Sequence, residues 1–214
     1  MKIIGIMPIK LQNERLTGKN TKLLGGIPLL QHSLINLINT ELCDEIYVYC
    51  SNKEITNYLP SKVQFLKRPE YLDLPTSNFT QIFSSFMKEK DADIYVFMHA
   101  TAPFVMVETM KECINAVKNN SYDSSFCATI IQDFLWQDNK PLNFDASNLP
   151  RSQDLKPIYR ETSGIYVFKK DVFTTLNRRI GNNPYIKVVS FKESIDINNP
   201  EDFDLAEALY DTNL

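Results

Sequence analysis

The opening of the chain constrains its fold more than any other stretch. Residues 3–7 form a short apolar run, Ile-Ile-Gly-Ile-Met, and Pro8 follows it directly. A run of this length bounded by proline is typical of a core strand in a parallel sheet. Ligands of open α/β sheets bind beyond the carboxyl ends of such strands. The polar loop of residues 10–20 is therefore where we expect the chemistry of this chain.

That loop and the residues after it carry a local excess of positive charge. Residues 10–22 hold four cations and one anion, in a chain whose formal net charge is -3. At an effective dielectric near 20, a cation about 4 Å from a phosphate gains roughly 4 kcal/mol before desolvation is subtracted. This favours an anionic ligand such as a triphosphate, but a solvated surface loop would show the same charges. The four cations are Lys10, Arg15, Lys19 and Lys22.

The composition excludes several classes of protein. Hydrophobic residues make up 43% of the 214 residues and charged residues 23%, as in ordinary soluble globular proteins. An isoelectric point near 5.5 argues against non-specific nucleic-acid binding. No apolar run approaches the roughly 20 residues that span a bilayer, and the first run is too short for a signal peptide. We therefore expect a cytoplasmic protein without a membrane segment.

Strand-like and helix-like stretches alternate along the chain, which predicts a single α/β domain with a mostly parallel sheet flanked by helices. Residues 93–98 form the strongest predicted strand, in the middle of the order. Residues 136–157 are rich in proline, asparagine and aspartate, lack a sustained period, and predict an excursion from the sheet. The other expected strands are 45–50, 63–66, a β-rich stretch within 122–134, and 187–191; the expected helices are 29–39, 52–58, 78–90 and 107–119.

The opening loop resembles the N-terminal signature of the cytidylyltransferases that make CMP-sialic acid and CMP-Kdo. The match runs through residues 8–10, 15–20 and 24–29 without gaps, although Lys10 replaces the family arginine. Gln12 and Asn13 replace a Gly-Ser pair, so the glycine that normally permits close backbone approach to the nucleotide is missing. The resemblance places Pro8, Ile9, Lys10, Arg15, Lys19 and Asn20 at the nucleotide, with Lys10, Arg15 and Lys19 on the phosphates and Asn20 on the cytosine.

Two further places in the middle of the chain match that family. Arg68, before Pro69, stands at the mouth of the nucleotide pocket, where the resemblance assigns it to a phosphate or to orienting the loop. A surface arginine before a turn is the alternative. After the central strand, His99 stands where the family places a glutamine that contacts the sugar. Thr101 takes the place of a metal-binding aspartate at the nucleotide, and a neutral hydroxyl cannot replace that charge.

A second strong match runs from Arg151 to Phe168 and resembles the sialic acid synthetases. The resemblance implies that Arg160 holds the carboxylate of the sugar, because a guanidinium can donate two parallel hydrogen bonds to it. Arg151 is a weaker second candidate. Ser163 replaces the family asparagine, a shorter side chain at a position that bears on which sugar fits.

The last match is the stretch Asp196-Ile197-Asn198, which resembles a D-I-D motif whose two aspartates bind the magnesium of the triphosphate. Alternation in an extended segment puts residues 196 and 198 on one side. An asparagine oxygen can ligate magnesium but brings no charge. Asn199, Pro200 and Asp202 have the pattern of a helix start.

Together these matches imply a nucleotidyltransferase fold that transfers CMP from CTP to an acidic, sialic acid-like or Kdo-like sugar and releases pyrophosphate, for surface polysaccharide synthesis. Magnesium is the implied cofactor, and an insert of about residues 134–158 is implied to form a homodimer. One alternative is a phosphorylated sugar or another capsule precursor as acceptor. Another is a nucleotide-binding relative without catalysis, as Thr101 and Asn198 suggest. A dehydrogenase is disfavoured because no G-x-G-x-x-G opens the first helix. The hypothesis requires Lys19 and Asp196 to lie on the same side of the molecule.

Overall fold

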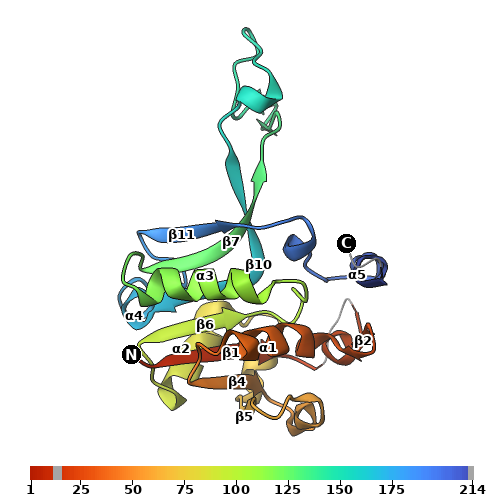
Figure 1. Cartoon of the computed structure of the whole chain (residues 1–214), viewed down its shortest axis with the longest axis vertical. Coiled ribbons are helices and arrows are strands. Elements are labelled where there is room, and N and C mark those ends of the chain that lie inside the picture. The colour runs from red at the N-terminus through yellow and green to blue at the C-terminus, as the bar shows by residue number, and fades with distance from the viewer. Residues whose placement is uncertain (12–15, 212–214) are drawn as a thin grey trace.

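The computed structural model describes residues 1–11 and 16–211, and its centre is a seven-stranded sheet of order β11-β7-β10-β6-β1-β4-β5 (Figure 1). Neighbouring strands run parallel except at β10, which is antiparallel to both β6 and β7. The mostly parallel α/β sheet expected from the alternation of elements is confirmed. The strands are β1 (Ile3–Ile9), β4 (Glu45–Cys50), β5 (Gln64–Lys67), β6 (Ile94–Met98), β7 (Ser124–Ile131), β10 (Ile158–Lys169) and β11 (Pro184–Val188).

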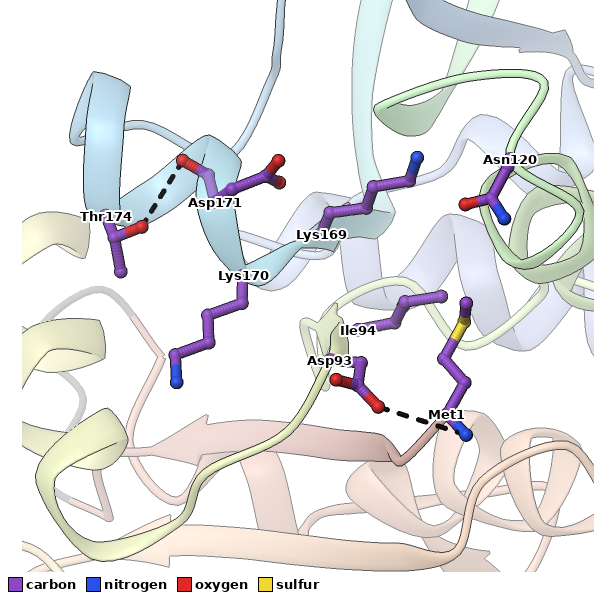
Figure 2. A pocket seen from close by; sticks show the side chains of 8 residues that line it. All are labelled: Met1, Asp93, Ile94, Asn120, Lys169, Lys170, Asp171 and Thr174. Carbon is purple, nitrogen blue, oxygen red and sulfur yellow. Dashed lines mark hydrogen bonds and ion pairs between the residues drawn. The ribbon is translucent and has the colours of Figure 1, made fainter.

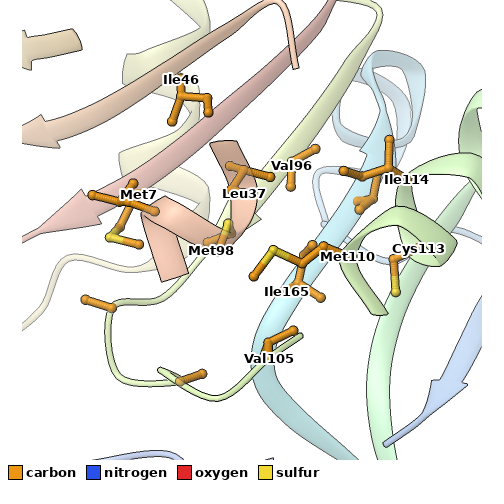
Figure 3. Close-up of a cluster of buried hydrophobic side chains, with 14 of the residues drawn as sticks. Met7, Leu37, Ile46, Val96, Met98, Val105, Met110, Cys113, Ile114 and Ile165 are labelled. Atoms are coloured by element: carbon orange, nitrogen blue, oxygen red, sulfur yellow. The ribbon is translucent and has the colours of Figure 1, made fainter. Parts of the chain in front are cut away.

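Helices cover both faces of the sheet because its central strands are apolar on both sides. Helices α1 (Leu29–Thr40) and α3 (Val107–Lys118) pack on one face through an aliphatic cluster that includes Met7, Leu37 and Met110 (Figure 3). Helices α2 (Phe79–Glu89) and α4 (Lys170–Leu176) pack on the other face. That second cluster is rich in aromatic rings, with Phe83 of α2 at its centre.

The start of α2 shows how local sequence sets an element. Asn78 accepts a hydrogen bond from the Gln81 backbone N–H at 3.1 Å, and the Gln81 side chain accepts one from the Asn78 N–H at 3.0 Å. This reciprocal capping box fixes the first turn. Phe83 and Phe86, three positions apart, then face the sheet and are fully buried. The helix expected over residues 78–90 is confirmed.

Two predicted elements differ from the observed ones. Residues 53–58 form a 3-10 helix, η2 (Lys53–Tyr58), rather than an α-helix, and the Asn52 side chain caps it by accepting the Glu54 N–H. The strand expected at residues 187–191 is β11, which begins at Pro184 and ends at Val188. Its boundaries are set by parallel pairing with β7, which the apolar pattern alone does not reveal.

A short hairpin and the last helix lie together at one side of the sheet (Figure 1). Strands β2 (Leu23–Leu24) and β3 (Ile27–Pro28) form the hairpin, and α5 (Pro200–Asp211) packs against it. The Cβ that an alanine would add at Gly25 lies 1.8 Å from the Tyr210 ring of α5. The hairpin turn therefore needs glycine for this close approach.

Residues 132–157, which we call the arm, project from the end of the sheet between β7 and β10 (Figure 1). The arm contains β8 (Trp136–Gln137), β9 (Lys140–Pro141) and the 3-10 helix η4 (Ser152–Asp154). The excursion expected from its composition is therefore observed. Across the described part of the chain, every helix falls short of the length and apolarity needed to cross a bilayer.

Candidate active site

Three segments that are distant in sequence meet beyond the carboxyl ends of the central strands. The Lys19 Nζ atom donates a hydrogen bond to the backbone oxygen of Ile197 at 2.7 Å, across 178 positions of sequence. The backbone N–H of Ile197 donates to the Thr101 oxygen at 2.8 Å. We call this contact set, formed by Lys19, Thr101 and Ile197, the junction. Lys19 therefore lies on the same side of the molecule as Asp196, as the sequence-based hypothesis required.

The junction is held from behind by a small apolar cluster. Lys19 begins the 3-10 helix η1 (Lys19–Thr21), whose preceding Gly18 has a positive φ of 65°. The cluster joins the hairpin, the start of α1, the segment before α5 and α5 itself, and Ile197 and Phe203 are fully buried in it. The Lys22 ammonium lies 3.7 Å from the centre of the Phe203 ring. The loop after β1 and the C-terminal segment are therefore packed as one unit.

Asp196 has one carboxylate oxygen without a partner in the described structure. The Asn198 side chain donates to Asp196 Oδ2 at 2.9 Å, so the two side chains share one side as alternation predicted. Oδ1 is buried and accepts no hydrogen bond from the described residues. An anionic oxygen in this state suits a cation. Asn198 thus orients Asp196 through its amide N–H, whereas the sequence pointed to its oxygen as a ligand.

The pattern expected after Asp196 is a helix start, and the structure shows it. Asp202 Oδ2 accepts the backbone N–H groups of Asn198 and Asn199, and Asn199 Oδ1 accepts the N–H of Asp202.

Within residues 1–11 and 16–211 there is no group of three or more His, Cys, Asp or Glu side chains arranged to hold a metal. A metal at Asp196 would therefore take most of its ligands from a triphosphate and water, as Mg²⁺ commonly does.

His99 follows β6 and faces the aromatic side of the sheet. Its ring centre lies 5.3 Å from that of Phe97 and 6.2 Å from that of Tyr166. The Nε2 atom is buried and has no hydrogen-bond partner among the described residues. Burial, and then the positive charge of Arg179, lower the pKa of His99 to about 4. His99 is therefore neutral at pH 7 and is suited to hydrogen bonding rather than to carrying charge.

Three residues beside His99 belong to the site, and sequence reasoning missed them. Arg179 Nη2 donates to Glu161 Oε1 at 3.1 Å and to the Tyr166 hydroxyl oxygen at 2.9 Å. The Tyr166 hydroxyl itself donates to Glu161. Arg179 lies in the turn between α4 and β11, outside every matched motif. Its neighbour Arg178 is an equally good candidate by sequence, so only the fold distinguishes them.

A cavity of about 550 Å³ opens beside the loop, at the carboxyl ends of β1, β4 and β5. Lys10, Ser51 and Asp73 are among its lining residues. Arg68 is 2% exposed and lies behind this wall, paired with Asp73, which also accepts from the Ser51 hydroxyl. The cavity has a volume typical of small-ligand sites. Arg68 thus supports the cavity wall through Asp73, in keeping with the orienting role weighed from the sequence.

The other predicted nucleotide residues surround the start of the loop. Ile9 is buried in the core, and Pro8 is half-buried beside it in β1. The buried Asn20 side chain donates to the Lys10 backbone oxygen at 2.9 Å, so it closes the base of the loop. Arg15, with Gln12 and Asn13, lies outside the described residues.

The two predicted sugar arginines lie on or near the arm rather than beside His99. Arg160 is exposed, and its Nε donates to Thr129 Oγ1 at 3.1 Å across the β10–β7 ladder. Arg151 pairs with Asp154 at 2.7 Å within the arm. In the described part of a single chain, neither arginine hydrogen-bonds to His99, Tyr166 or Asp196.

A second cavity, of about 400 Å³, lies at the opposite edge of the sheet, near the start of β6 (Figure 2). Its charges are largely paired. The Met1 amine lies 4.0 Å from Asp93, and Lys170 pairs with Asp91 at 2.6 Å. Figure 2 shows the Lys169 and Lys170 side chains extending in different directions. None of the residues assigned to the nucleotide, the metal or the sugar lines this cavity, so the junction and the cavity next to it form the better candidate site.

Comparison with known proteins shows which family the chain resembles. Residues 4–214 match the family model described as Cytidylyltransferase. The CMP-N,N'-diacetyllegionaminic acid synthase of Legionella pneumophila is 27% identical over 238 residues, covering 100% of this chain and 98% of that protein. The N-acylneuraminate cytidylyltransferase A of Danio rerio is 23% identical over 199 residues, covering 88% of this chain and 46% of that protein.

The fold also matches solved structures. The structure of CMP:2-keto-3-deoxy-manno-octonic acid synthetase complexed with CTP has a TM-score of 0.74 at 14% identity and covers 100% of both chains. This likeness shows the shared fold, and the family model shows the kinship. The chain therefore belongs to the cytidylyltransferase family and is an enzyme of the nucleotidyltransferase type, as the match of its opening loop predicted.

Proposed function

We propose that this chain transfers the cytidylyl group from CTP to an acidic 2-keto sugar of the sialic acid or Kdo type, for surface polysaccharide synthesis. The observation that supports this most is the junction, which brings a buried lysine and the segment of an unpartnered carboxylate oxygen to one place. A cation and a metal-binding carboxylate side by side suit a triphosphate. The relatives are named for CMP-legionaminic acid synthesis and for N-acylneuraminate cytidylyl transfer, which favours an acidic acceptor.

In the proposed reaction, a hydroxyl oxygen of the sugar forms a bond to the α-phosphorus of CTP. The bond from that phosphorus to the oxygen bridging to the β-phosphate breaks, pyrophosphate leaves, and the hydroxyl proton is released. Catalysis of such a transfer rests on positioning and on stabilising charge at the phosphates. We propose that Lys10, Arg15 and Lys19 share this task, and the position of Lys19 at the junction supports its part.

We propose that Mg²⁺ is the metal and that Asp196 holds it. The fit rests on Asp196 Oδ1, a buried carboxylate oxygen that accepts no hydrogen bond from residues 1–11 and 16–211. When bound, the ion would neutralise charge on the triphosphate. We propose that Asn198 mainly orients Asp196 through its amide N–H. Its side-chain oxygen is a weaker second candidate for binding the Mg²⁺ ion. Thr101 contributes its backbone oxygen to the junction, and its neutral side chain leaves the carboxylate charge to Asp196 alone.

We propose that the nucleoside occupies the 550 Å³ cavity beside Lys10. Lys10 lines it, and Pro8 and Ile9 at the end of β1 lead the chain to Lys10. Asn20 shapes the loop above it by holding the Lys10 oxygen. Arg68 acts through Asp73, which fixes the wall opposite.

For the acceptor we propose a place beside His99, whose neutral ring can hydrogen-bond to the sugar. Arg151 and Arg160 belong to this half of the reaction only if a second chain presents them, because both lie on or near the projecting arm (Figure 1). We therefore propose a homodimer in which the arm of one chain reaches the site of its partner.

The test is a pyrophosphate-release assay with the purified protein, Mg²⁺ and CTP against a panel of neuraminic, legionaminic and pseudaminic acids and Kdo. We expect release with at least one acid. Thermal stabilisation by CTP, UTP, ATP and GTP, measured in parallel, reports base choice because a bound nucleotide raises the melting temperature. CTP binding without pyrophosphate release from any acid would contradict the proposal. Recovery of turnover in Asn198→Asp would then show that this chain is a nucleotide-binding protein that has lost catalysis. Pyrophosphate release with a phosphorylated sugar, and with none of the acids, would show that the acceptor is a phosphorylated sugar.

A further inference from the structure

Arg179 is a cation on the acceptor side of the site that no matched motif includes. It comes from the turn between α4 and β11, yet its guanidinium lies 3.7 Å from the centre of the Tyr166 ring of β10. The Phe79 ring at the start of α2 is 5.4 Å away. Tyr166 in turn packs beside His99. The guanidinium thus lies where β10, α2 and the end of β6 come together.

The guanidinium is fixed in place. Nη2 makes both bonds of the pair with Glu161 and Tyr166, at 3.1 and 2.9 Å, and the ring below it restricts tilting. The side chain is 28% exposed. Arg178, one residue earlier, is exposed, and among the described residues its side chain bonds to Asn182 alone, in its own turn. Contacts from other elements of the fold therefore fix the orientation of the Arg179 side chain, whereas they do not fix that of Arg178.

Two sets of polar groups beside each other lack protein partners here. The Nε and Nη1 groups of Arg179 donate to none of the described residues, and His99 Nε2 is likewise unpartnered. In the proposed function the triphosphate binds at the junction, so these groups beside His99 are left for the second substrate. A guanidinium with donors to spare is the natural partner of an anion on the second substrate, since charge-assisted hydrogen bonds are roughly twice as strong as neutral ones.

We propose that Arg179 binds the carboxylate of the acceptor sugar within its own chain, with Glu161 and Tyr166 as positioning residues. This rests on the proposed function and deepens it. Arg160 is the competing candidate, but alternation along β10 turns it away from Glu161. Its ladder partner is Thr129, whereas Glu161 pairs with Ala128 on the aromatic side that holds His99.

The first experiment compares Arg179→Gln with Arg178→Gln, a matched loss of one charge at the adjacent position. We expect Arg179→Gln to raise the KM for the sugar acid about 10- to 100-fold, the loss typical of a charge-assisted hydrogen bond, with the KM for CTP within about twofold. Arg178→Gln should leave both constants within about twofold. Arg179→Lys keeps the charge and, if the Gln variant does not fold, should show an intermediate KM for the acid.

The second experiment asks whether the carboxylate is what Arg179 recognises. The acid and its carboxamide are compared as acceptors for the wild type, Arg179→Gln, Glu161→Gln and Arg160→Gln. The wild type should prefer the acid, Arg179→Gln should lose about 10- to 100-fold of that preference, and Glu161→Gln should lose a smaller part. A preference that survives in Arg179→Gln and disappears in Arg160→Gln overturns the inference and assigns the carboxylate to Arg160. If the wild type releases no pyrophosphate with any acid, the proposed function fails and this inference with it.

Discussion

The junction and the arm differ in how far the residues of a single chain bury and hydrogen-bond their side chains. At the junction, Lys19 is only 9% exposed, and its ammonium is bonded to Ile197 from the far end of the sequence. In the arm, Trp136 is 60% exposed, and other apolar side chains stand in solvent around it. One chain thus builds by itself the region to which we assign the phosphates. The arm leaves its apolar side chains exposed in a single chain.

The physical reason lies in what each region buries. A buried charge is tolerated only when it is hydrogen-bonded, and the junction meets that condition with backbone oxygens and an apolar cluster behind them. The arm offers two short two-residue strands, which are marginal without further packing. Its exposed large apolar residues are Phe134, Trp136, Leu142 and Leu149. Such a surface suits a partner, and we expect a second copy of the chain.

The largest effect should come from breaking the junction. Lys19→Met removes a cation next to the phosphates and the bond to Ile197, so we expect kcat/KM to fall about 10²- to 10³-fold. Lys22→Met removes the same charge from an exposed position three residues later and should stay within about threefold. Initial-rate pyrophosphate assays measure both. Equal losses in the two variants would show that net loop charge matters and that the junction does not.

The arm should matter for association rather than for folding. Trp136→Ser removes an exposed aromatic ring, and we expect it to weaken the dimer by about 2 kcal/mol, a typical interface hot spot, with the melting temperature of the monomer unchanged. Light scattering across a dilution series measures the shift. Tyr71→Ser, at an exposed site on the 3-10 helix η3 (Glu70–Asp73), is the control. A wild-type chain that is monomeric at every concentration would contradict the proposal that the arm forms a dimer contact.

His99 should make the stability of the body depend on pH. Its pKa is about 4 in the folded chain against 6.5 ordinarily, so between these values the unfolded chain binds more protons. The free energy of unfolding should therefore fall by about 2–3 kcal/mol as the pH drops from 6.5 to 4. Urea denaturation at several pH values measures the slope, and His99→Gln should remove this share of it. Burial also lowers the pKa of His32, which leaves a residual slope of the same sign. An unchanged slope in His99→Gln would contradict a His99 that is neutral in the folded chain.

The smallest effect concerns the hairpin behind the junction. Gly25 and Gly26 both have positive φ, of 56° and 85°, but only Gly25 faces Tyr210. Gly26→Ala should cost about 1 kcal/mol of unfolding free energy through backbone strain alone, and Gly25→Ala about 2 kcal/mol through strain and the clash with α5. Chemical denaturation measures both. Equal costs would show that the Tyr210 ring moves aside freely and that α5 does not press on the hairpin.

Sequence reasoning succeeded where a local signal carries the information. The strand at residues 45–50 matches its apolar pattern residue for residue, and the helix expected over residues 78–90 is observed as α2. The proximity of Lys19 to residues 196–198 followed from family-like motifs at both ends of the chain, which a single sequence without them would not reveal.

Other features depend on tertiary pairing and could not be predicted from local patterns. The apolar pair Val188-Val189 led to a predicted last strand that ends at residue 191, whereas the observed ladder with β7 ends at Val188. Arg179 and Arg178 are indistinguishable until Tyr166 and Glu161 are placed beside one of them. Arg160 lies in a matched stretch, but its side chain donates a hydrogen bond to Thr129, so its proposed role would need a second chain.

The most direct test of a metal shared between Asp196 and the triphosphate is the magnesium dependence of CTP affinity, measured by titration calorimetry. We expect Mg²⁺ to tighten CTP binding to the wild type by at least about tenfold, the equivalent of 1.4 kcal/mol, and to have almost no effect on binding to Asp196→Asn. An Asp196→Asn variant in which Mg²⁺ tightens CTP binding as strongly as in the wild type would contradict the account.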